Sequence, residues 1–497
     1  RDIAAATRAA YAEIEGSASI AFFLEDLGNL LLATNTGSLF TLANRRGTFL
    51  AFASERYILQ RLAQSADFAA TVGEFTLEQL KAGHGLLVSL EDAALHGFNG
   101  FGPLAAAAPR DASEPAAGMR LAPKPTRFEI VDHTKTAADM QRCTRCILPS
   151  SYPFMDFDAG GVCSYCRNWR KITVKGEQAL LDAVAPYRSQ DGSPDVIVAF
   201  SGGRDSSYGL HYVKQELGMN PVAFTYDWGM VTDLARRNQA RICGKLGIEH
   251  IVRSADIATK RRYIRKNIEA WLKRPELGMV TLFTAGDKEF YHHARQLRKE
   301  TGIKLVVFCT GNMIEDTPYK TGLCGIREKD HGMTLTGLAR SDELRLLWYY
   351  AKNYLRNPAY INQSLRDTFN AYWQTFVVKD DFLYLYHYLE WEEETIVGTI
   401  LREYDWEVAT DTTSTWRIGD WTAAFYNYIY LTIAGWTEDE VMLSNMIREG
   451  VHTRERALEL AAEYRRPRLP TLQEYAQAVG FNCEEALNII NAAPKAY

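Results

Sequence analysis

The sequence has no strong excess of charge of either sign. Its 497 residues contain 56 Lys and Arg against 61 Asp and Glu, which gives a formal net charge of −5. Proteins that bind nucleic acid usually carry a basic excess or a basic stripe, so no nucleic-acid partner is expected. The most basic segment is interpreted as the solvated face of a helix, with contact to a substrate phosphate as the alternative. It contains Lys260, Arg261, Arg262, Arg265 and Lys266.

Long apolar runs are also missing. A helix needs about 20 apolar residues to cross a bilayer, and the most apolar stretch, 421–436, is shorter and is interrupted by Asn427. It predicts a buried helix. No signal peptide is recognisable, but the chain begins with Arg1, so targeting cannot be judged from this end. We expect a cytoplasmic protein without a membrane partner.

Cysteine is scarce, yet half of it is clustered. Of 8 cysteines, Cys143 and Cys146 form one CxxC, and Cys163 and Cys166 form a second after a loop rich in Pro and Gly. This spacing is typical of a zinc ribbon, a closed Cys₄ site with a structural Zn²⁺. An iron–sulfur cluster is an alternative, as are disulfides, which need an oxidising compartment. The other cysteines are interpreted as incidental thiols: Cys243, Cys309, Cys324 and Cys483.

A phosphate-binding turn is predicted in the segment DVIVAFSGGRDSS, residues 195–207. Residues 196–199 are apolar without alternation, as in a strand buried on both faces of a parallel sheet. Gly202 and Gly203 allow a sharp turn, and a helix that starts near Asp205 directs free N–H groups at the turn. A plain strand-to-helix turn is the alternative interpretation.

The heptapeptide SGGRDSS resembles the SGGxDS loop of the PP-loop ATP pyrophosphatases, relatives of asparagine synthetase and the tRNA thiolases. The resemblance implies that the loop holds the pyrophosphate part of ATP and that Asp205 helps to position Mg²⁺. Arg204 stands at the variable position, where a cation can pair with a phosphate oxygen, and Asp205 and Arg204 are the catalytic candidates. The expected ATP-binding residues of the loop are Ser201, Gly202, Gly203, Arg204, Asp205, Ser206 and Ser207.

An α/β alternation continues after the loop. Apolar strands are predicted at 221–226, 249–253 and 304–309, with a helix at 234–246. This order favours a doubly wound parallel sheet of the PP-loop type, whose ligands lie at the carboxyl ends of strands. The residues expected there, as further ATP contacts, are Asp227, Gly311 and Asn312. Asp287 either caps a predicted helix or, with Lys288, binds substrate or Mg²⁺.

The two CxxC motifs followed by SGGRDSS resemble the N-acetyl sugar amidotransferases, which act on nucleotide sugars for bacterial surface glycans. The resemblance covers roughly residues 141–330. It implies that ATP adenylates an amide or carboxyl oxygen of a small-molecule substrate, that pyrophosphate leaves, and that ammonia displaces AMP. Such chemistry fits the loop, since its amides and Mg²⁺ stabilise the charge of the departing group.

The first hundred residues resemble the second half of a class II glutaminase domain, as in asparagine synthetase. Strands are expected at 20–24, 30–34 and 86–90, and residues 52–55 match its FASE turn. The nucleophilic cysteine of that domain has no counterpart, because no cysteine precedes Cys143. A glutaminase segment or subunit is therefore the expected partner, with a degenerate remnant or an unrelated β sandwich as alternatives.

The resulting prediction is an ATP-dependent, AMP-forming amidotransferase that transfers glutamine-derived ammonia to a small activated metabolite. The alternatives are a tRNA thiolase, an asparagine-synthetase-like enzyme and a non-catalytic zinc and ATP-binding assembly subunit. Assembly as a homo-oligomer is left open. A helical C-terminal domain is expected, with an Arg417–Asp420 ion pair and a capping box at Thr471 and Glu474. The predicted domains are 1–102 (glutaminase-like), 103–140 (linker), 141–175 (zinc ribbon), 176–330 (PP-loop) and 331–497 (helical).

Overall fold

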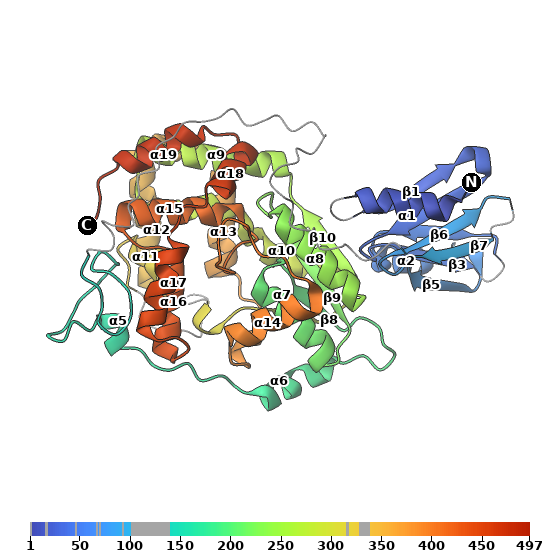
Figure 1. Cartoon of the computed structure of the whole chain (residues 1–497), viewed down its shortest axis with the longest axis horizontal. Helices are drawn as coiled ribbons and strands as arrows, with labels where there is room; N and C mark the ends of the chain where they lie inside the picture. The colour runs from blue at the N-terminus through green and yellow to red at the C-terminus, as the bar shows by residue number, and fades with distance from the viewer. Residues whose placement is uncertain are drawn as a thin grey trace.

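The computed structural model describes residues 2–14, 18–44, 47–65, 68, 71–91, 94–100, 140–314, 318–327 and 338–497. The predicted linker, 103–140, lies outside the described residues apart from Met140. Two small antiparallel sheets, a five-stranded parallel sheet and a large set of C-terminal helices follow one another along the chain (Figure 1).

The parallel sheet has the strand order β10-β9-β8-β11-β12. All of its neighbouring strands pair in parallel, which confirms the predicted α/β class. Since β9 and β10 lie on one side of β8 and β11 on the other, the order reverses between β8 and β11, the place where doubly wound folds bind ligands. The strands are β8 (Val196–Ala199), β9 (Pro221–Asp227), β10 (His250–Ser254), β11 (Leu305–Phe308) and β12 (Leu383–Tyr384).

Both faces of this sheet are buried. In β8, Ile197 packs into one core while Val196 and Val198 pack into the other, so a run without alternation is what the position requires. The first core includes Ile268 and Leu297, and the second includes Leu210 and Ile242. The helices that bring these and other side chains are α6 (Glu177–Val184), α7 (Arg204–His211), α8 (Asp233–Leu246), α9 (Ile257–Lys273) and α10 (Phe290–Thr301).

The N-terminal sheets have the orders β1-β2-β6-β7 and β4-β3-β5. Leu32 of one sheet and Leu50 of the other share a core, so the two sheets pack face to face. The strands predicted at 20–24, 30–34 and 86–90 are present, and residues 52–55 lead from β4 into α2. The elements are α1 (Ile3–Glu13), β1 (Ser19–Leu24), β2 (Asn29–Thr34), β3 (Phe40–Asn44), β4 (Leu50–Ala53), α2 (Arg56–Ala63), β5 (Phe75–Gln79), β6 (His84–Ser89) and β7 (Leu95–Asn99).

The C-terminal region is helical, as expected, but β12 from this region joins the parallel sheet. In Figure 1 its orange and red helices surround the carboxyl end of the sheet. The elements are α11 (Tyr319–Gly322), α12 (Arg340–Arg356), α13 (Leu365–Tyr372), α14 (Glu393–Tyr404), α15 (Trp421–Ala434), α16 (Glu438–Glu449), α17 (Arg454–Tyr464), α18 (Leu469–Val479) and α19 (Cys483–Ala492). No helix among the described residues is long and apolar enough to span a bilayer.

Three local predictions were wrong. Helix α18 begins at Leu469, and Thr471 lies inside it with its hydroxyl donated to Asp411, so Thr471 and Glu474 form no capping box. Asp287 caps no helix, because it lies inside the 3₁₀ segment η4 (Leu277–Glu289) that precedes α10. In the basic segment, Lys260 is buried and paired with Asp367 rather than solvated.

Candidate functional site

The segment SGGRDSS forms a tight turn between β8 and α7. Gly202 has φ +78°, and a Cβ at this position would lie 2.5 Å from the carbonyl oxygen of Ala235, so only glycine fits. Ser201 and Ser206 brace the turn, with 2.9 Å between their hydroxyl oxygens. No side chain caps the N-terminus of α7, whose first N–H groups are therefore available to an anion.

The guanidinium of Arg204 lies among side chains of the C-terminal region. Its guanidinium is buried, forms an ion pair with Glu393 and donates to the Thr415 hydroxyl at 2.8 Å. The rings of Trp391 and Trp416 lie 4.8 and 5.1 Å from it. The structure thus engages Arg204 with the C-terminal region, and the expected pairing with a phosphate oxygen remains a prediction.

Asp205 sits in the first turn of α7. Its Oδ1 accepts a hydrogen bond of 2.7 Å from the Trp391 indole and lies 3.5 Å from Arg204 Nε. Burial raises the pKa of this carboxyl, and the nearby Arg204 acts in the opposite sense. A carboxylate beside an uncapped turn is a suitable ligand for a divalent cation.

The other residues expected at the strand ends have partners inside the fold. Asp227 ends β9, and its carboxylate binds the Gly229 N–H at 2.9 Å and Arg236 at 2.9 Å. Gly311 and Asn312 follow β11 with positive φ. A Cβ on Gly311 would lie 2.6 Å from the His387 ring, and Asn312 is buried, so both residues are packed inside the fold after β11.

A short strap, defined as residues 416–420, crosses the turn. Gly419 accepts a hydrogen bond from Thr232 N, and a Cβ on Gly419 would lie 3.9 Å from the Ser201 carbonyl oxygen. Trp416 stacks on Arg204, as described above, and Arg417 adopts a left-handed φ of +48°. Such a conformation is costly for a non-glycine residue and occurs often at functional sites.

Beyond the strap lies a cavity of about 620 Å³. It is enclosed by η4, α11, α12, α13, α15 and the strap. Sequence reasoning placed Asp287 and Lys288 at the crevice, and both line this cavity. They are joined there by Lys320, Arg417 and Asp420. The turn and the cavity are therefore neighbours that share the strap as a common wall.

Glu438 organises the charges at this wall. The carboxylate is buried and accepts hydrogen bonds from the Tyr319 and Tyr426 hydroxyls at 2.8 and 2.6 Å. Arg417 Nε lies 3.0 Å and Lys320 Nζ 3.4 Å from its oxygens. The predicted Arg417–Asp420 ion pair was wrong, because Arg417 pairs with Glu438 while Asp420 caps α15. No sequence motif indicated a role for Glu438, because its partners come from distant parts of the chain.

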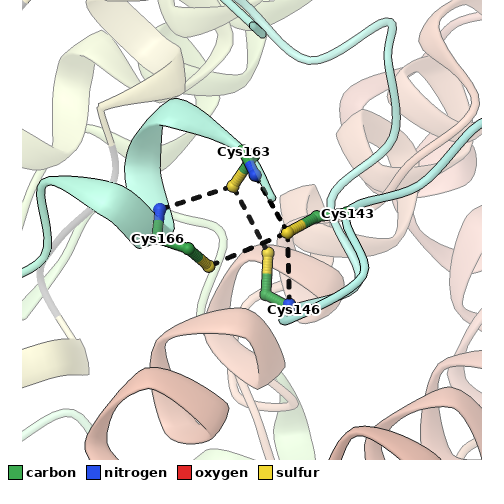
Figure 2. A group of neighbouring side chains, drawn as sticks. All are labelled: Cys143, Cys146, Cys163 and Cys166. Carbon is green, nitrogen blue, oxygen red and sulfur yellow. Dashed lines mark hydrogen bonds between the residues drawn. The ribbon is translucent and has the colours of Figure 1, made fainter. Parts of the chain in front are cut away.

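The four clustered cysteines meet in one buried site (Figure 2). Their sulfur atoms all lie within 4.8 Å of one another, with Cys143 Sγ 3.9 Å from Cys166 Sγ and Cys146 Sγ 3.8 Å from Cys163 Sγ. Four thiolates bound tetrahedrally at about 2.3 Å to one ion lie about 3.8 Å apart. A cubane iron–sulfur cluster gives each thiolate its own iron and holds the sulfurs farther apart. The geometry therefore fits a single metal ion.

Groups from the two CxxC motifs and from the C-terminal helices surround this site. The backbone N–H groups of Arg145, Cys146 and Cys163 point at Cys143 Sγ from 3.2 to 3.4 Å. Arg448 from α16 reaches Cys146 Sγ at 3.7 Å, and Arg454 donates to the carbonyl oxygens of Cys143 and Cys146. Cationic donors of this kind stabilise thiolate ligands.

No family model and no curated protein matches the sequence. Among solved structures, a similarity is found to the U34-tRNA thiolase NcsA from Methanococcus maripaludis with its [4Fe-4S] cluster. The two chains are 11% identical, the match covers 68% of this chain and 88% of that chain, and the TM-score is 0.22. A similarity this low supports no inference about fold or activity.

Proposed function

We propose that the protein is an ATP-dependent, AMP-forming enzyme that activates a carbonyl or amide oxygen and transfers ammonia to the activated carbon. The observation that carries the proposal is the uncapped SGGRDSS turn at the reversal point of the sheet, beside a strap whose Arg417 and Asp420 line a charged cavity. Such a turn suits the pyrophosphate of ATP, and such a cavity suits the acceptor.

The proposed chemistry has two steps. An acceptor oxygen in the cavity attacks the α-phosphorus of ATP, so that a new O–P bond forms and the bond to pyrophosphate breaks. Ammonia then attacks the activated carbon, and AMP leaves with the oxygen. The N–H groups of the turn hold the departing pyrophosphate, while Arg417 and Lys320 face the acceptor. Mg²⁺ near Asp205 would supply charge neutralisation for the phosphates.

For the Cys₄ site we propose structural Zn²⁺. The donor set, the full burial of the four cysteines and the spacing of their sulfurs fit one closed tetrahedral ion. All four positions are taken by protein, so no position is open for a substrate. The role proposed for the metal is to fasten the ribbon, residues 141–175, to the C-terminal helices.

The source of ammonia and the acceptor are finer points of the proposal. The two N-terminal sheets support a glutaminase-like unit that acts with a separate glutaminase segment or subunit. The resemblance to the N-acetyl sugar amidotransferases implies a nucleotide sugar as acceptor, although the lining of the cavity favours a different class of acceptor. Both points remain predictions.

A second candidate, sulfur transfer as in a PP-loop thiolase, is favoured by one observation. Cys324 lines the cavity, although its sequence context gave no reason to single it out. Burial raises the pKa of this thiol to about 12, which leaves little thiolate at neutral pH. Cys309, which follows β11, is also buried, and burial raises its pKa above the ordinary value of a thiol. Nitrogen transfer remains the better-supported function.

ATP/pyrophosphate exchange tests the proposal. With a panel of carboxylate and amide acceptors, the wild-type protein should catalyse exchange, and Asp205→Asn should lower its rate at least about 100-fold. Asp191→Asn, a change on an exposed loop, is the matched control. Adenylation would be contradicted if exchange persists in Asp205→Asn, or if no acceptor of the panel supports exchange. Loss of product formation in Cys324→Ala would favour sulfur transfer instead.

A further inference from the structure

The cavity has walls of two kinds. The strap, η4 and α11 contribute charged side chains: Asp287, Lys288, Lys320, Arg417 and Asp420. These charges form one group. Burial raises the pKa of the Asp287 carboxyl, and Lys288, Arg417 and Lys320 lie close enough to act in the opposite sense. Helices α12 and α13 contribute a mainly apolar wall that includes Leu346, Leu347, Ala351, Leu365 and Phe369.

The apolar wall continues to the outside of the molecule. Phe369 lines the cavity and is 67% exposed, and Leu347 lines it and is 41% exposed. On the surface, Trp373 is 46% exposed and stacks on Phe369 with ring centroids 6.3 Å apart. Contiguous exposed apolar surface of this kind marks a binding region in a water-facing protein.

We infer that the acceptor is an amphiphile. Its carbonyl- or carboxylate-bearing end lies at Arg417, Lys288 and Lys320, next to the SGGRDSS turn, and its apolar remainder, an alkyl chain or an aromatic ring, lies along α12 and α13. This inference rests on the proposed function, because it identifies the cavity as the acceptor site.

The two walls explain why this ligand class fits better than a fully polar one. A small acceptor held at the charged wall alone would leave the apolar wall in contact with water. A nucleotide sugar that filled the whole cavity would place hydroxyl or phosphate groups against the side chains of Leu346, Leu365 and Phe369, which cannot replace their water. An amphiphile pairs its charge with the cations and removes apolar surface from water on both sides.

Calorimetric titration of the full chain without ATP tests the inference. The probes are straight-chain carboxylates from butanoate to decanoate and a matching series of phenylalkanoates, which distinguish a chain from a ring. Within one series, affinity should rise about fourfold for each buried methylene group. Phe369→Asp and Leu347→Asp should remove most of this dependence. Both side chains are exposed, so these variants are expected to fold.

Leu355→Asp is the matched control, because Leu355 is 73% exposed on α12 but does not line the cavity. It should keep the chain-length dependence. An affinity that does not change with chain length, an equal loss in Leu355→Asp, or tighter binding of UDP-N-acetylglucosamine than of decanoate would overturn the inference. ATP binding, measured separately with wild type and Gly202→Ala, reports on the proposed function. Normal ATP binding without chain-length dependence defeats the inference alone. Chain-length dependence without ATP binding defeats the proposed function, and the cavity is then an amphiphile site but not an acceptor site.

Discussion

Arg417 Nε lies 3.0 Å from the Glu438 carboxylate, on a backbone with φ +48°. The carboxylate is almost fully buried, whereas 38% of the Arg417 side chain is exposed. One partner is thus fixed in the core and the other faces the cavity. The pair fixes a cation beside the proposed ATP site, and it accounts for the persistence of a strained backbone conformation in the strap.

Removal of the Glu438 charge should destabilise the protein. Glu438→Gln leaves two cations without their counter-charge and is expected to lower the free energy of unfolding by about 2 to 3 kcal/mol, measured by urea denaturation at pH 7. The expected loss of stability is smaller than that for a fully buried ion pair that loses one partner, because both cations retain some contact with water. Glu459→Gln, at an exposed ion pair, should change stability by less than about 0.5 kcal/mol.

The same residue predicts a dependence on pH. Although burial opposes ionisation, Arg417 and Lys320 lower the pKa of Glu438 to about 2. The folded-state pKa is depressed, so this contribution is present above pH 4.5, the ordinary value, and is lost as the pH falls toward 2. Glu438→Gln should flatten the stability profile in that window. A variant profile parallel to that of the wild type would contradict the assignment.

Gly202→Ala should abolish ATP binding. The new Cβ would lie 2.5 Å from the Ala235 carbonyl oxygen, so the turn must open and its N–H groups lose their alignment. Gly192→Ala is the matched control, because Gly192 has a similar φ of +79° and no atom lies within 4 Å of the point that its Cβ would occupy. It should cost about 1 kcal/mol of stability and leave ATP binding intact. Equal effects of the two variants would show that backbone strain alone matters.

Metal analysis should find one zinc ion per chain and no iron–sulfur absorption band. Cys146→Ser should remove the ion and lower the thermal unfolding midpoint, since the ribbon loses its link to α16 and α17. Cys483→Ser, away from the cluster, should retain the metal. Iron in a stoichiometric amount would refute the zinc assignment.

His250 should make the protein acid-sensitive. Burial lowers its pKa to about 4, and its Nε2 lies 2.8 Å from the Thr225 hydroxyl. Below pH 6.5 the His250 imidazole binds a proton in the unfolded chain but stays neutral in the folded chain. The free energy of unfolding should therefore fall by about 2 to 3 kcal/mol as the pH drops from 6.5 to 4. His250→Gln should remove this slope, whereas His84→Gln in the N-terminal sheet should leave it unchanged.

Elements set by local pattern were predictable from the sequence. The strands around 196–199 and 221–227 follow from uninterrupted apolar runs, and the cysteine cluster follows from its spacing. Contacts between distant segments were not predictable. Arg204 pairs with Glu393, 189 residues away, because the C-terminal region offers a carboxylate and two indole rings. The cavity was missed for the same reason, since the strap and several elements far apart in the chain enclose it.

Helix α16 has a consequence for the order in which the protein matures. Its first residue, Glu438, pairs with Arg417 and Lys320 of the cavity wall, and Arg448 near its end reaches the sulfur of Cys146, 302 residues earlier in the chain. During synthesis the two CxxC motifs emerge from the ribosome long before this helix, so at first they lack the contact with Arg448. The Cys₄ cluster and the charged wall of the cavity are therefore completed by the same late event. In a chain whose synthesis stops before α16, both the Cys₄ cluster and the cavity wall are incomplete.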